Sequence, residues 1–235
     1  TCLVSYEVAS QIPLPEHPRP DFKRPMWENL NGVWNFRFDE KNHGLDKKWY
    51  LSENIKFEKK IIVPFPWGSK LSKVEDEANI GWYSRKINVS LDWKTKMTYI
   101  TIGASDWETT IWLDGKLIGK HQGGYVPFSF DLTPHIKYGS DQVLTIRVDD
   151  DAGDPKKFKR GYALYGKQGY GNARGIWQTV YLEARGENHI DAIHFTPDID
   201  NKKINVTAYL KNNAEDEIQL SIKIKTETGY INHKV

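Results

Sequence analysis

The sequence predicts an all-β protein, a β-sandwich or jelly roll, and three observations lead to this prediction. Several short segments alternate apolar and polar residues with a period of two, which places every second side chain on one face of a strand, as in residues 143–149. Turn residues separate these segments, and the pair Asp114-Gly115 is typical of a two-residue hairpin turn. Helical periodicity of useful length is almost absent, so we expect strands to pack on strands.

Composition and charge are those of a folded protein. The 235 residues are 39% hydrophobic and 13% aromatic, which indicates a globular chain long enough for a substantial core. Each of the nine tryptophans is either a core anchor or a platform for a sugar ring. The net charge is +2 with both signs interspersed, which argues against a nucleic-acid partner. No apolar run is long enough to span a membrane, and the single cysteine, Cys2, excludes an intramolecular disulfide.

In chain order, residues 1–25 are expected to form an extended arm, because five of the eleven prolines lie there and preclude a helix. Apolar-rich segments after the arm predict strands, and the polar stretches between them predict loops, the first with a short helical turn. The expected strands are 33–38, 61–63, 82–91 and 97–103, the last two of hairpin character, and the expected loops are 39–57 and 69–79.

The stretch at residues 104–131 is expected to organise this part of the fold. It predicts a β-meander, in which each strand pairs with the next along the chain, because Asp114-Gly115 makes a tight turn and Gly123-Gly124 breaks the returning strand. The expected strands are 107–113, 117–121 and 126–130, anchored by Trp112, Phe128 and Phe130, and further strands are expected at 143–149 and 176–183.

Five segments carry a resemblance to a known family. They are WENLNGVW at 27–34, VPFPW at 63–67, GWY at 81–83, ASDWETTIWLDGKLIGKHQGGYVPFSFD at 104–131 and GIWQTV at 175–180. Each is unspecific alone, but their order and spacing together are specific. From about residue 24 to residue 183 the chain resembles the N-terminal sugar-binding domain of glycoside hydrolase family 2, the β-galactosidase and β-glucuronidase group. This resemblance implies a jelly roll at residues 26–185 and a carbohydrate as partner.

The composition shifts near Arg185, and strand-like runs follow at 190–195, 204–210 and 218–224. In the family an immunoglobulin-like sandwich follows the jelly roll, and such a sandwich takes about 100 residues. The resemblance therefore implies a truncated immunoglobulin-like β-sandwich at residues 186–235. Because three strands cannot bury their inner face alone, we expect a second copy to cover it and the chain to be a homo-oligomer. The expected apolar face consists of Ile204, Val206, Leu210, Ile218, Leu220, Ile222 and Ile224.

The densest carboxylate cluster is Asp149-Asp150-Asp151, at the end of a predicted strand, with Asp154 beyond it. Three interpretations stay open: a solvated strand end, a site for Ca²⁺ or Na⁺, and part of a sugar pocket. In galactosidases of the family an acidic residue in this region helps to hold a metal beside the sugar. Apart from such an ion near these three aspartates, no cofactor is expected.

A glycine-rich segment follows this cluster. Residues 161–167 match the first seven positions of a P-loop, but Gln168 stands where a Ser or Thr would bind Mg²⁺, which argues against nucleotide binding. In glucuronidases of the family an Asp six residues before the Gly of the Gly-Ile pair reaches the sugar, and the matching position here is Gly169. The resemblance therefore favours a β-galactosidase-like enzyme. Candidate substrate-binding residues are Asp150, Asp151, Lys167, Gln168, Asn172 and Arg174, and an exposed loop position is the alternative for each.

No catalytic residue is expected in this chain. Family 2 hydrolysis uses two glutamates on strand ends of a TIM barrel, and the sequence has no alternating strand and helix pattern. The resemblance implies the non-catalytic N-terminal portion of an enzyme that hydrolyses terminal β-glycosides, where it shapes one wall of the active site. The alternatives are a stand-alone carbohydrate-binding module and a purely structural interaction domain. A bacterial periplasmic or secreted location is expected over a cytoplasmic one.

Overall fold

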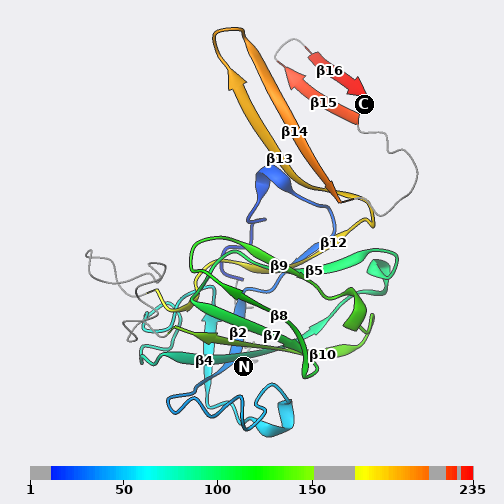
Figure 1. The fold of residues 1–235 in the computed structure, drawn as a ribbon. Helices are drawn as coiled ribbons and strands as arrows, with labels where there is room; N and C mark the ends of the chain where they lie inside the picture. Colours follow the sequence, from blue (N-terminus) through cyan, green and yellow to red (C-terminus); the bar gives the residue numbers. More distant parts are fainter. Residues whose placement is uncertain (1–11, 151–172, 212–220, 227–228, 235) are drawn as a thin grey trace, which may run out of the picture. The chain divides into compact units, whose positions relative to one another are not determined.

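The computed structural model describes residues 12–150, 173–211, 221–226 and 229–234 (Figure 1). The chain divides into two compact units, Thr1–Arg185 and Gly186–Val235, and each is described by itself. Within the described ranges the regular structure is strands and four short 3₁₀ turns, and no helix there could span a membrane. The predicted all-β class is confirmed. The 3₁₀ turns are η1 (Pro20–Phe22), η2 (Ser52–Asn54), η3 (Leu91–Trp93) and η4 (Thr133–His135).

The first unit is a sandwich of two antiparallel sheets, which confirms the predicted β-sandwich. The four-stranded sheet has the order β1 (Trp27–Asn29), β12 (Val180–Arg185), β5 (Met97–Ile102), β9 (Phe128–Asp131). The six-stranded sheet has the order β3 (Lys59–Val63), β2 (Gly32–Phe38), β4 (Ile80–Asn88), β10 (Asp141–Asp149), β7 (Glu108–Leu113), β8 (Lys116–Gln122). A separate two-stranded sheet is formed by β11 (Gly175–Ile176) and β6 (Ser105–Asp106).

The main core lies between the two large sheets. Trp34 and Tyr83 from the six-stranded sheet pack edge to face, with ring centroids 6.5 Å apart, against a cluster that includes Ile100 and Leu182 from the four-stranded sheet. All four side chains are buried. Burying a large apolar side chain contributes about 1.5–3 kcal/mol to folding. The alternation seen in the sequence places such side chains on the inner faces of both sheets, so their burial stabilises the sandwich.

A second apolar cluster covers the other face of the six-stranded sheet. Because neighbouring strand residues point to opposite faces, Trp82 belongs to this second cluster while Tyr83 lies in the main core. The Trp82 and Trp112 rings stack at 5.4 Å, and Tyr50, from the loop after β2, stacks on Trp112 at 5.4 Å. Trp112 therefore anchors the loop at residues 39–58 to the outer face of the sheet.

Two predicted connections within this unit are wrong. β4 and β5 do not form a hairpin, because β4 pairs with β2 and β10 while β5 pairs with β9 and β12 in the other sheet. The predicted meander is also interrupted: β7 and β8 form the expected hairpin, with positive φ at Asp114 and Gly115, but β9 crosses to the four-stranded sheet. The glycine pair before β9 lets the chain leave the sheet, with φ of 139° at Gly123.

The described part of the N-terminal arm lies on the outer face of the four-stranded sheet. The buried His17 ring packs edge to face on Trp27 at 4.6 Å, and the Asn29 side chain donates a hydrogen bond to the Leu14 carbonyl. Arg24 ends the arm with an ion pair to the buried Glu183, at 3.0 Å. The described part of the predicted arm, residues 12–25, is thus held by specific contacts, and its extent over residues 1–25 stays a prediction.

The second unit consists of two hairpins in its described residues. β13 (His189–Asp198) pairs with β14 (Lys203–Lys211), and β15 (Ser221–Thr226) pairs with β16 (Gly229–Lys234), a strand that the sequence did not predict. The predicted apolar face does not run across three paired strands, because β14 and β15 belong to separate sheets. Ile218 and Leu220 lie outside the described residues, and for Ile224 the backbone alone is described. The immunoglobulin-like character of this unit stays a prediction.

One face of the β13–β14 hairpin is apolar along its length. A bulge between Ile190 and Ala192 shifts the register by one residue, so that Ile190 and Ile193 share a face instead of alternating. Their partners on β14, Leu210 and Ala208, are also apolar. The face consists of Ile190, Ile193, Phe195, Pro197, Ile204, Val206, Ala208 and Leu210, with Phe195 59% and Ile204 52% exposed.

Self-association through this face stays a prediction, and it has a direct test. We expect static light scattering at micromolar concentration to give twice the monomer mass, because burying this face removes apolar surface from water. Phe195→Lys should return the chain to the monomer mass, whereas Thr207→Lys, on the opposite face of the same hairpin, should leave the mass unchanged. A monomeric parent chain would contradict the prediction.

Candidate functional site

Several strands of the six-stranded sheet end at one rim. Register places the end of β2, the start of β4, the end of β10 and the start of β7 side by side, with Asp149 paired to both Ile80 and Glu108. The loop after β2, the segment before β4 and Asp150, which follows β10, therefore meet here. Asp149 and Asp150 of the predicted cluster lie at this rim, and Asp151 lies outside the described residues.

The first two aspartates of the cluster have different partners, because neighbouring residues of an extended chain point in opposite directions. Asp149 forms a buried ion pair with Arg147, Nη2 to Oδ2 at 2.9 Å, and Arg147 also donates to the Asn42 amide oxygen at 2.8 Å. Asp150 instead pairs with Arg174, Nε to Oδ2 at 3.0 Å. Each carboxylate thus has a guanidinium as a close partner, and the cluster does not present both carboxylates on one side.

Arg174 connects three parts of the rim. Besides Asp150, its guanidinium pairs with Glu77 at 3.0 Å, and its backbone forms a β-bridge with Trp67. Its side chain is 15% exposed and the Asp150 side chain 4%. Of the predicted substrate-binding residues, the structure brings Asp150 and Arg174 together as a cross-link of the rim. Lys167, Gln168 and Asn172, like Asp151, lie outside the described residues.

A pocket of about 530 Å³ opens beside this cross-link. It is lined by the loop after β2, the segment before β4 and the end of β10, through Asp39, Glu40, Asn42, Glu77, Ala78, Asn79, Ile80 and Asp149. Asn79 and Glu40 are exposed side chains with hydrogen-bonding groups that could reach a ligand. Amides and carboxylates of this kind orient a sugar through its hydroxyl groups, while the pocket walls fix its position.

Sequence reasoning missed Glu77 and Asn79 because they lie in a polar stretch that was predicted only as a loop. One signal could have found them. Asn79 immediately precedes β4, the strand that carries Gly81-Trp82-Tyr83, and polar residues at strand ends of a sandwich gather at its rim. Its carbonyl accepts a hydrogen bond from the Asp150 N–H at 2.7 Å, which ties the two strand ends together.

A metal site at the aspartate cluster stays a prediction. Among the described residues no group of three or more His, Cys, Asp or Glu side chains is arranged to hold a metal ion. The two described aspartates of the cluster already lie against Arg147 and Arg174, whose positive charge opposes a cation at the same oxygens.

Comparisons with known proteins place this chain beside carbohydrate-active enzymes. Residues 27–184 match the family model described as "Glycosyl hydrolases family 2, sugar binding domain". A β-galactosidase of Thermoanaerobacter pseudethanolicus is 29% identical over 180 residues, which are 73% of this chain and 21% of that protein. A β-glucuronidase of Rattus norvegicus is 24% identical over 230 residues, 86% of this chain and 35% of that protein. The chain therefore spans about a fifth to a third of the length of these curated relatives.

Solved structures show the same fold. The β-glucuronidase of Lactobacillus rhamnosus superimposes with a TM-score of 0.73 at 20% identity, covering 91% of this chain and 38% of that protein. A Ruminococcus gnavus β-glucuronidase in complex with uronic deoxynojirimycin has a TM-score of 0.72 at 15% identity. At these identities the likeness establishes the architecture, and the rim must be interpreted from its own residues.

Proposed function

Because the chain belongs to glycosyl hydrolase family 2 and carries the family's sugar-binding domain at residues 27–184, we propose that it is the non-catalytic N-terminal portion of an enzyme that hydrolyses terminal β-glycosides. The resemblance predicted from the sequence is confirmed. In this proposal the two catalytic carboxyl groups come from a catalytic barrel elsewhere in the protein, as the family mechanism requires. This domain supplies one wall of the active site.

The observation that carries the proposal is the rim pocket lined by Glu77, Asn79 and Asp149. It combines exposed hydrogen-bonding groups with a cross-linked frame, in which Arg174 holds both Asp150 and Glu77. A rigid frame keeps polar groups in a fixed geometry, so that less entropy is lost when they bind a sugar. The proposed role of Asn79 is to exchange hydrogen bonds with a sugar hydroxyl.

Charge in the pocket favours a neutral sugar, as in a β-galactosidase, over a uronate. Four of the eight lining residues are acidic and none is basic: Asp39, Glu40, Glu77 and Asp149. Although Arg147 and Arg174 offset some of this charge, Glu40 has no ion pair within the described residues. A uronate carboxylate placed here would meet like charge, which costs binding energy. The Gly169 position, where related glucuronidases carry an Asp, points in the same direction.

The alternative of a stand-alone carbohydrate-binding module would be favoured by an exposed row of coplanar aromatic rings. The coplanar stack in this domain, Tyr50 with Trp112 and Trp82, is built into the apolar cluster that anchors the loop at 39–58. Among the described residues of the first unit, Tyr125 is the sole exposed aromatic ring of Phe, Tyr or Trp. The observed arrangement therefore favours a wall of a larger site over an independent platform.

Asn79→Ala in the longer enzyme is expected to lower kcat/KM for a nitrophenyl β-galactoside about tenfold, which is ~1.4 kcal/mol, the value of one hydrogen bond that is no longer made. Asn88→Ala, at the other end of the same strand, is the matched control and should leave kcat/KM unchanged. The 235-residue chain alone should show no turnover. Turnover by this chain that a substitution within it abolishes would overturn the proposal, as would full activity of Asn79→Ala.

A further inference from the structure

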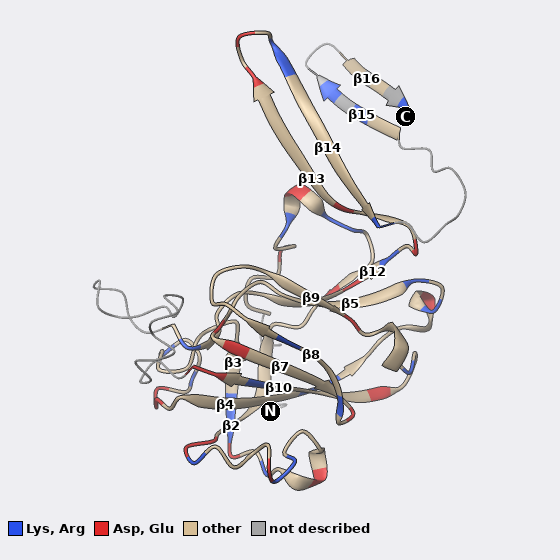
Figure 2. Cartoon of the chain, viewed as in Figure 1, with Lys and Arg blue, Asp and Glu red and all other residues tan. Residues whose placement is uncertain are grey.

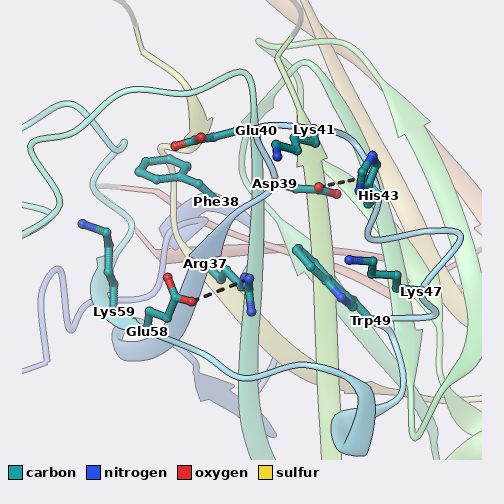
Figure 3. Close-up of a pocket in the computed structure, with 10 residues that line it drawn as sticks. All are labelled: Arg37, Phe38, Asp39, Glu40, Lys41, His43, Lys47, Trp49, Glu58 and Lys59. Atoms are coloured by element: carbon teal, nitrogen blue, oxygen red, sulfur yellow. Dashed lines mark hydrogen bonds and ion pairs between the residues drawn. The ribbon is translucent and has the colours of Figure 1, made fainter.

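A second pocket lies on the outer side of the loop that follows β2 (Figure 3). Its volume is about 360 Å³, which falls within the range of about 300–1,000 Å³ that is usual for small-molecule sites. Its walls come from the end of β2, the loop after it and the segment leading into β3, a part of the chain that carries both basic and acidic residues (Figure 2). It meets the rim pocket at Asp39 and Glu40 but is otherwise lined by different residues.

The loop that forms one wall is held in place from inside. Asp39 is buried and accepts three hydrogen bonds, from the backbone N–H groups of His43 and Gly44 at 2.8 Å each and from the Trp82 indole at 3.1 Å. A Cβ on Gly44 would lie 2.7 Å from the Trp82 ring, so the loop packs directly on the sheet. The Asp39 carboxylate is therefore a structural anchor of the loop, and its oxygens face these three donors.

Aromatic surface and a guanidinium form the floor of the pocket. The Arg37 guanidinium lies over the Trp49 ring, 4.4 Å from its centroid, and donates a hydrogen bond to the Lys56 carbonyl at 3.0 Å. Trp49 in turn packs edge to face on Trp82 at 5.9 Å, so this pair is fixed to the apolar cluster below. Arg37 also pairs loosely with the exposed Glu58, at 3.6 Å, a contact that an incoming anion can replace.

The remaining lining charges favour an anion. Lys41 and Lys47 project from the loop, together with His43, on the side of the pocket opposite Arg37 and Glu58 (Figure 3). Within the described residues neither lysine has an ion pair, whereas Lys59 is paired with Asp76. Among the described residues, Glu40 is the one lining carboxylate without a cation or hydrogen-bond partner. Two unneutralised ammonium groups and a planar guanidinium thus converge on one pocket.

We propose that this pocket is a second saccharide-binding site, selective for an anionic sugar unit. The carboxylate or sulfate group of that unit lies between Lys41, Lys47 and the Arg37 guanidinium, which can bind it in the two-pronged manner typical of arginine. The ring carbons of the sugar pack against Phe38 and Trp49, which line the pocket. The two pockets share Asp39 and Glu40, but the rim pocket has no basic lining residue, whereas this pocket has an arginine and three lysines. They therefore select sugars of different charge.

Isothermal titration calorimetry of the 235-residue chain at low ionic strength tests this proposal. The probes are digalacturonate, a sulfated disaccharide, the neutral disaccharide lactose and inorganic sulfate. We expect at least one anionic disaccharide to bind at least tenfold more tightly than both lactose and inorganic sulfate, and to weaken when salt is raised. Which of the two binds more tightly tells whether a carboxylate or a sulfate is the recognised group.

Variants assign the binding to this pocket. The double variant Lys41→Ala with Lys47→Ala should weaken the anionic disaccharide about tenfold, whereas Lys116→Ala with Lys120→Ala, on the distant strand β8, should not change its affinity. Asn79→Ala should also leave it unchanged, which separates this site from the proposed role of the rim pocket. Equal affinity for lactose and both anionic probes, equal affinity for inorganic sulfate, or unchanged affinity in the Lys41/Lys47 variant would each overturn the proposal.

Discussion

Replacing Gly175 by alanine is expected to lower the free energy of unfolding of the first unit by about 3–4 kcal/mol. Two effects add at this position. Gly175 has φ of 78°, where a side chain costs about 1–2 kcal/mol. A Cβ there would also overlap the Trp67 ring and the Tyr83 hydroxyl, and overpacking a core costs about 1–3 kcal/mol. Urea unfolding followed by tryptophan fluorescence measures the loss, since all nine tryptophans lie in this unit.

The surroundings of Gly175 leave little room for adjustment. Trp67 is buried and its indole donates to the Ala78 carbonyl at 3.0 Å, while the Tyr83 hydroxyl accepts a hydrogen bond from the Ile176 N–H at 3.2 Å. Tyr83 is fully buried, and this burial raises the pKa of its hydroxyl far above its ordinary value. Neither ring can move away without losing these contacts.

Two other glycines separate the two effects. Gly32 has φ of 105° with no atom within 4 Å of a built Cβ, so Gly32→Ala should cost about 1–2 kcal/mol from backbone strain alone. A Cβ on Gly81 would lie 2.8 Å from the Phe36 and Trp67 rings, and its φ is not in the positive range, so Gly81→Ala should cost about 1–3 kcal/mol from overlap alone. If Gly175→Ala lowers the free energy of unfolding no more than Gly32→Ala, the predicted overlap of the Cβ with Trp67 and Tyr83 is contradicted.

Strand positions could be predicted because alternation is a local property. The predicted segments at 33–38 and 143–149 correspond to β2 and β10 within two residues. β2 has the expected buried and less buried faces, whereas β10 is buried on both faces from Leu144 onward. Pairing could not be predicted in the same way. Alternation tells which side chains face a core but not which sheet a strand joins, so β5 and β9 were predicted to pair with their neighbours in sequence and instead pair with each other.

The candidate site could be predicted from the sequence only in part, for a similar reason. Asp150 and Arg174 were predicted as polar groups near a sugar, but their ion pair joins residues on either side of a long connection, and no sequence spacing indicates it. Asn79 was missed because its position matters only once β4 and β10 are aligned, when its carbonyl meets the Asp150 N–H. Residues that form a rim become neighbours through the sheet, and register is a property of the whole fold.

Removing one partner of the buried ion pair at the rim should destabilise the first unit at least as strongly as Gly175→Ala. Asp149→Ala removes the carboxylate partner of the Arg147 guanidinium, whose side chain is 3% exposed, and leaves its hydrogen bond to the uncharged Asn42 amide oxygen. An uncompensated charge buried in this way costs about 3–5 kcal/mol. The same urea unfolding experiment measures this loss. Lys137→Ala, which breaks the exposed pair with Asp114, is the control and should cost less than about 1 kcal/mol.

A double variant distinguishes the cost of an unpaired charge from the value of the pair itself. Arg147→Met with Asp149→Leu removes both charges and fills most of the volume with apolar atoms, and such replacements are often neutral or stabilising. We therefore expect the double variant to recover most of the stability that Asp149→Ala loses. A double variant as unstable as Asp149→Ala would mean that the guanidinium and carboxylate stabilise the rim through their own hydrogen bonds, with Asn42 at the centre of that network.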